Sequence, residues 1–82
     1  MSTFKHATGM FHSPQRHYWR NTEDAKGTYA RPATMDTPEG MQPAVAVFND
    51  KFIRGVYSLD EALRIATQMA DSIAYHKQKE AS

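Results

Sequence analysis

The chain has 82 residues, enough for one small domain that buries only about 60% of the surface exposed by its unfolded chain. It contains no cysteine, which excludes disulfide bonds, cysteine-based zinc sites and a cysteine nucleophile. The formal net charge of +1 says little about partners, and no stretch approaches the roughly 18 apolar residues of a membrane span. Since the N-terminus also lacks the apolar run of a signal peptide, we expect a cytoplasmic protein with no membrane association.

Residues 1–43 are predicted to form a largely irregular or extended arm that ends in a turn or linker at residues 36–40. This half holds all four prolines and three of the four glycines, but no valine, isoleucine or leucine, so it cannot build a conventional core. It is nevertheless rich in aromatic residues, which is unusual for a solvated tail. We therefore expect the arm to lay its aromatic side chains on a surface, either that of the C-terminal half or that of another molecule. These side chains are Phe4, Phe11, Tyr18, Trp19 and Tyr29.

The most site-like stretch of the arm lies within residues 12–20, where aromatic and cationic side chains are interleaved. Aromatic and arginine side chains are enriched at protein interfaces, which favours a protein partner or a second copy of the chain. The same pattern suits stacking on nucleic-acid bases, although the three cations of residues 1–22 (Lys5, Arg16 and Arg20) would give a salt slope of only about −2.7 on duplex DNA. A third alternative is that the rings dock on the chain's own core. The candidate partner-binding residues here are Arg16, His17, Tyr18, Trp19 and Arg20.

Residues 44–82 are predicted to form a β-hairpin that runs directly into a helix. The segments 44–48 and 51–57 are rich in β-branched and aromatic residues and are separated by an Asn-Asp pair suited to a two-residue turn. The helix is expected over residues 58–78, because Ser58 and Glu61 have the spacing of a capping box. An isolated hairpin is marginal in water, so the helix is expected to fold back across it.

The predicted helix has one apolar face, which allows two interpretations. The face is either directed to the chain's own core or forms a seam for a partner helix. Its breadth and its many alanines favour the core, with Leu63 at the centre of the buried side. Tyr75 projects from the opposite, polar face and is either a simple exposed aromatic or a further partner-binding residue. The apolar face comprises Leu59, Ala62, Leu63, Ala66, Met69, Ala70, Ile73 and Ala74.

Support for catalysis or for a metal site is weak. The sequence has no Gly-x-Ser-x-Gly elbow, no phosphate-binding glycine loop and no His-Glu-x-x-His pair. His12 and His17 project in opposite directions from a strand and about 140° apart on a helix, so a metal site would need a loop and a further ligand such as His6. We therefore expect a protein that is not an enzyme, with no catalytic residue, metal site, cofactor or small-molecule substrate.

Together these features predict a small α+β single domain, with a C-terminal β-hairpin followed by one amphipathic α-helix (44–82) and an N-terminal arm (1–43). The expected function is that of a non-enzymatic accessory or adaptor protein. It would bind a larger protein assembly, or self-associate, through the arm and the hairpin. The alternative is a small nucleic-acid-binding module that uses the basic and aromatic segment Arg16–Arg20.

Overall fold

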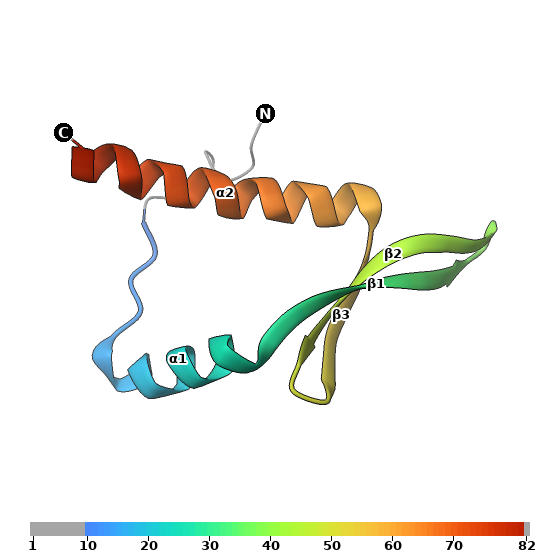
Figure 1. The fold of residues 1–82 in the computed structure, drawn as a ribbon, viewed down its shortest axis with the longest axis horizontal. Helices are drawn as coiled ribbons and strands as arrows, with labels where there is room; N and C mark the ends of the chain where they lie inside the picture. The colour runs from blue at the N-terminus through green and yellow to red at the C-terminus, as the bar shows by residue number, and fades with distance from the viewer. Residues whose placement is uncertain (1–9, 82) are drawn as a thin grey trace.

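The structure is a computed structural model that describes residues 10–81, and its strands form one three-stranded antiparallel sheet in the order β1-β2-β3. A short 3-10 turn and helix α1 precede the sheet, and helix α2 follows it, so that the two helices project from different parts of the sheet (Figure 1). The elements are η2 (Gln15–His17), α1 (Tyr18–Gly27), β1 (Thr28–Thr37), β2 (Gly40–Asn49), β3 (Phe52–Ser58) and α2 (Leu59–Ala81).

The predicted fold is wrong in its N-terminal half. The chain is a small α+β protein, but the expected irregular arm contains a helix and a full-length strand. β1 pairs with β2 from Thr28↔Asn49 to Thr37↔Gly40, so the predicted hairpin is the second half of a larger sheet. The local sequence of β1 conceals the strand because it has no valine or isoleucine and includes Pro32. β1 is an edge strand, where proline is tolerated, and its pairing with β2 overrides its weak propensity.

The segment expected to be a turn or linker, residues 36–40, forms the turn that closes the hairpin between β1 and β2. Gly40 has a φ of 107°, a conformation open to glycine but strained for other residues. The Thr37 hydroxyl donates a hydrogen bond to the carbonyl oxygen of Gly40 at 2.7 Å and accepts one from the backbone N–H of Glu39 at 3.1 Å. Local side-chain bonds of this kind specify a tight turn. The tip of this hairpin extends beyond the end of β3 (Figure 1).

The hairpin between β2 and β3 was predicted and occurs, with its turn at Asp50 and Lys51. Asp50 adopts a φ of 57°, in the left-handed region that aspartate enters more readily than most residues. The register shifts by a bulge next to Val47, opposite Gly55. A side chain at Gly55 would meet the ring of Tyr57, because an added Cβ would lie 2.7 Å from Tyr57 Cζ. The glycine therefore allows this ring to lie against the strand.

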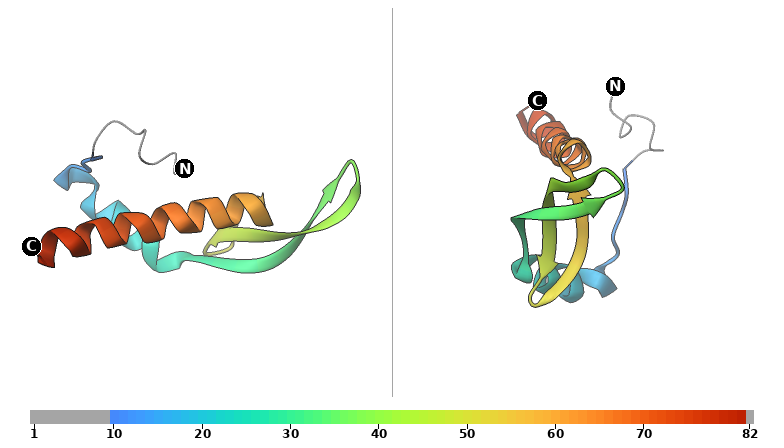
Figure 2. Two further views of the ribbon diagram at one scale, coloured as in Figure 1. Left: turned by 90° about the horizontal axis from the view of Figure 1, so that it is seen from above. Right: turned by 90° about the vertical axis from the view of Figure 1, so that its right-hand side faces the viewer.

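Helix α2 begins where the sequence predicts. The Ser58 hydroxyl accepts a hydrogen bond from the backbone N–H of Glu61 at 3.3 Å, which satisfies one of the free donors of the first turn. The Glu61 carboxylate pairs with Arg64 at 2.7 Å. At 23 residues, α2 is about 35 Å long, and its C-terminal part extends beyond the strands (Figures 1 and 2).

The predicted direction of the apolar face of α2 is wrong. Of its large apolar side chains, Leu63, Met69 and Ile73 are 67%, 64% and 58% exposed, and Leu59 is half exposed. A different side of the helix is half-buried, and this side is turned about 110° from the centre of the apolar face. A helix that follows a strand directly has little freedom to rotate, which outweighs the preference of the apolar face for the sheet. The half-buried residues are Ala62, Ile65, Gln68 and Ser72.

The single chain has almost no core. Among the described residues, the buried hydrophobic positions are Ala44 and Ala46 of the central strand, each only 3% exposed. Beside them, the rings of Tyr29 and Phe48 stack across β1 and β2 with their centroids 5.4 Å apart. The radius of gyration is 15.6 Å, against about 12 Å for a compact domain of this length. The fold is therefore an open framework of paired strands and projecting helices.

We predict that Ser58→Ala lowers the free energy of unfolding by about 1 kcal/mol, because the first turn of α2 loses its side-chain acceptor. Ser72→Ala is the matched control in the same helix. The Ser72 hydroxyl donates a hydrogen bond to the carbonyl oxygen of Gln68 in the same helix. Alanine is a better helix former than serine. Chemical denaturation of both variants tests this, and an equal loss in the two would contradict the capping role.

Candidate protein-binding surface

Helix α1 is held against the turn between β2 and β3 by polar contacts. The Asn49 side-chain amide donates to the carbonyl oxygen of Asp24 at 2.8 Å and to the hydroxyl of Thr28 at 3.0 Å. The backbone N–H of Asp50 donates to the carbonyl oxygen of Gly27 at 2.8 Å. These bonds satisfy carbonyl oxygens in the last turn of α1, which have no N–H partner within the helix. They fix the direction in which α1 leaves the sheet.

An ion pair adds to this attachment. Arg54 Nη2 of β3 lies 3.0 Å from Asp24 Oδ1 of α1. Both side chains are about half exposed, so the pair stabilises the contact by less than about 1 kcal/mol. The main effect of the pair is therefore on orientation, and the position of α1 depends mostly on the hydrogen bonds around Asn49.

The five predicted partner-binding residues of the arm lie together at the start of α1, and all but the half-buried His17 are exposed. We call them the arm cluster: Arg16, His17, Tyr18, Trp19 and Arg20. The Tyr18 and Trp19 rings contact each other edge to face, with centroids 5.6 Å apart, and Arg20 Nη2 donates to His17 Nδ1 at 2.8 Å. Trp19 is 73% exposed and Tyr18 is also exposed, so the alternative in which these rings dock on the core is wrong.

Tyr75, the sixth predicted residue, lies on α2 and not in the arm cluster. Its ring contacts that of His76 edge to face, with centroids 5.6 Å apart. Figure 2 shows α1 and α2 on opposite sides of the sheet, so the fold does not bring the two predicted surfaces together. A role for Tyr75 in binding stays a prediction.

Among the described elements, α2 carries the most exposed large apolar side chains, although its apolar face was expected to meet the core. We call the apolar face of α2 within residues 59–73 the α2 stripe. One signal in the sequence pointed to it: the N-terminal half has no large aliphatic residue except methionine with which to cover a long apolar helix. The α2 stripe comprises the exposed residues Leu59, Leu63, Ala66, Met69, Ala70 and Ile73, together with Ala62, which is half-buried at its edge.

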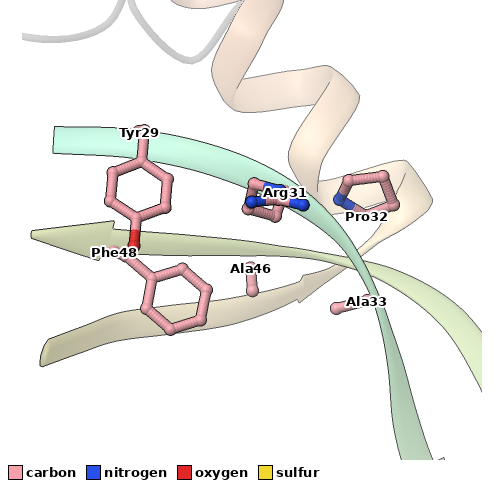
Figure 3. Close-up of a pocket in the computed structure, with 6 residues that line it drawn as sticks. All are labelled: Tyr29, Arg31, Pro32, Ala33, Ala46 and Phe48. Carbon is pink, nitrogen blue, oxygen red and sulfur yellow. The ribbon is translucent and has the colours of Figure 1, made fainter. Parts of the chain in front are cut away.

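A shallow groove of about 320 Å³ lies on the sheet between β1 and β2 (Figure 3). The stacked rings of Tyr29 and Phe48 form one end of it, and Ala33 and Ala46 leave room at the other. Arg31 contributes the charged group of the lining. The groove is wide open and mostly apolar, which suits a side chain of another protein better than a reacting substrate. Pro32 completes its lining.

Two further features of the described chain bear on the candidate site. Within residues 10–81, no group of three or more histidine, aspartate or glutamate side chains lies close enough together to hold a metal ion. His6, one further ligand that the metal alternative could use, lies outside the described residues. No helix in this part of the chain has the length and apolar character needed to cross a membrane.

The chain matches no protein-family model, and no curated protein or solved structure is significantly similar to it. The function therefore has to be argued from the exposed surface alone. That surface offers the α2 stripe and the sheet groove, which are mostly apolar, and the arm cluster, which combines two aromatic rings with two arginines.

We predict that Asn49→Ala loosens α1 while the sheet persists, because two hydrogen bonds to the end of α1 and the start of β1 are lost, worth about 1–2 kcal/mol together. Amide hydrogen exchange should quicken in residues 18–27 and change little in β2 and β3. Lys26→Ala is the control, since it removes only the exposed ion pair to Glu23. Unchanged exchange in α1 of the Asn49 variant would contradict this account of the attachment.

Proposed function

We propose that this chain is a non-enzymatic protein-binding subunit, an accessory or adaptor protein that joins a larger protein assembly or self-associates. The main observation behind the proposal is that small apolar side chains are buried and many large ones are exposed, the reverse of a typical globular protein. Two alanines are buried, whereas most of the large apolar side chains of α1, α2 and the β2–β3 hairpin are exposed. Monomeric proteins rarely expose large contiguous apolar patches, and such patches mark interaction sites.

The total exposed area also supports this proposal, because it is larger than that of a compact folded chain of the same mass. The chain exposes 7270 Å², whereas a compact folded chain of its 9.3 kDa mass exposes about 5000 Å². Part of the excess belongs to the ten residues outside the described range. Even when those residues are given the full area of an unfolded chain, about 1600 Å², the rest exceeds its compact value by about 1100 Å². This excess is surface that a partner would cover.

The side chains on this surface are of the kinds found at protein interfaces. Tryptophan, tyrosine and arginine dominate binding hot spots, and Tyr18, Trp19 and Arg20 occur together in the arm cluster. Phe52 and Ile53 add exposed apolar area at the end of the β2–β3 hairpin. The polar contacts around Asn49 hold the last turn of α1 to this turn, so the helix that begins with the arm cluster is attached to the hairpin.

Nucleic acid is the less favoured partner. The arm cluster offers two arginines, and one of them already donates to His17. Exposed leucine, methionine and isoleucine on α2 contribute nothing to phosphate contacts or base stacking. A nucleic-acid-binding module would leave this aliphatic surface unused, whereas a protein partner would bury it.

The proposal is tested by cross-linking the full-length tagged chain inside its native host and measuring the mass of the products. We predict a defined protein complex whose yield falls in Trp19→Ala, because the exposed ring supplies contact area, and is retained in Lys26→Ala on the same helix. Recovery of only the 9.3 kDa chain would contradict the proposal. A complex that dissolves on nuclease treatment, with a salt slope reduced by replacing Arg16 and Arg20, would favour the nucleic-acid alternative.

A further inference from the structure

The residues of the α2 stripe are arranged symmetrically about Ala66 along the helix. Positions at equal distances on either side of Ala66 carry side chains of the same size class. Leu59 and Ile73 are the outer large pair, and Leu63 and Met69 are the inner large pair. Ala62 and Ala70 form the small pair between them. The stripe therefore presents the same sequence of large and small side chains when read in either direction.

We infer that the α2 stripe is a homodimer interface, in which α2 pairs antiparallel with α2 of a second copy around a two-fold axis at Ala66. This inference rests on the proposed protein-binding function and names the partner for this one surface. A two-fold interface has to be self-complementary, and a stripe that reads alike in both directions meets that requirement. Leu63 would pack against Met69 of the partner subunit, and Leu59 against Ile73 of the partner subunit.

The spacing of the stripe fits helix-on-helix packing. Leu59, Leu63, Ala66, Ala70 and Ile73 follow one another at alternating intervals of four and three residues, the spacing of a coiled-coil seam. The small side chain of Ala66 lies at the two-fold axis, where the two helices approach each other to about 8–10 Å between their helix axes. The larger side chains lie on both sides of it and would interdigitate.

The helix macrodipoles favour the antiparallel direction, because antiparallel helices place their opposite partial charges side by side.

The shape of the protomer leaves room for this pairing. The side of α2 that contacts β2 and β3 is turned about 110° from the centre of the stripe, so the sheet does not cover it. The C-terminal part of α2 extends beyond its own strands (Figures 1 and 2). Antiparallel pairing places that part beside the N-terminal part of the other helix, where the second copy carries its sheet.

Single cysteines test the geometry directly, because the chain has none of its own. Under mild oxidation, Ala66→Cys should form a disulfide-linked dimer. Leu59→Cys alone should not, because its two copies would lie about 20 Å apart, but a mixture with Ile73→Cys should form the mixed dimer. Glu61→Cys, on the side of α2 away from the stripe, is the control and should stay monomeric. Self-linkage of Leu59→Cys would overturn the antiparallel arrangement.

Sedimentation equilibrium of the full chain tests the interface itself. Leu63→Gln should raise the dimer dissociation constant about tenfold or more, because each dimer loses two central leucines, while helical circular dichroism is retained. Glu61→Gln should leave the constant unchanged. A monomeric wild-type chain, or a dimer unaffected by Leu63→Gln, would overturn the inference. Either result would leave the proposed function intact if the cross-linked complex in cells contains a different protein, whereas absence of any complex would overturn both.

Discussion

The small size of the side chains at the centre of the sheet is the constraint on which the rest of the structure depends. Ala44 and Ala46 occupy the only buried hydrophobic positions of the described chain. Alanine buries little apolar area, so the hydrophobic stabilisation of a single chain is slight. The strand pairing and the polar attachment of α1 around Asn49 then carry much of the architecture. A fold built in this way leaves many of its large apolar side chains exposed in the single chain.

The sequence predicts the elements whose signals are local. The start of α2 follows from the Ser58 cap, and the β2–β3 hairpin follows from its β-branched residues around a turn. β1 was missed because its strand character comes from its pairing with β2, whose residues lie up to 21 positions away, as at Thr28↔Asn49. Helix α1 was missed because it has neither a side-chain cap nor an apolar face to mark it.

The residues of the candidate site could be predicted from the sequence, but the direction in which the apolar face of α2 points could not. The arm cluster was found from its aromatic and cationic residues, and the structure leaves its Trp19 exposed in the single chain. The apolar face of α2 was also found, yet periodicity gives no information on which neighbour such a face meets. The direct junction at Ser58 sets the rotation of α2 and turns Leu63 and Ile73 outward. The symmetry about Ala66 bears on binding only because the structure shows that this face of α2 is exposed.

The central claim is that this chain completes its hydrophobic burial by association with a second copy. The most direct measurement is the thermal unfolding midpoint of the purified full-length chain over a wide range of protein concentrations. When the folded state is an assembly, mass action makes its stability depend on concentration. The account predicts a midpoint that rises steadily with concentration. A midpoint that stays constant from the most dilute to the most concentrated sample would show that the single chain holds its fold alone, and would contradict the account.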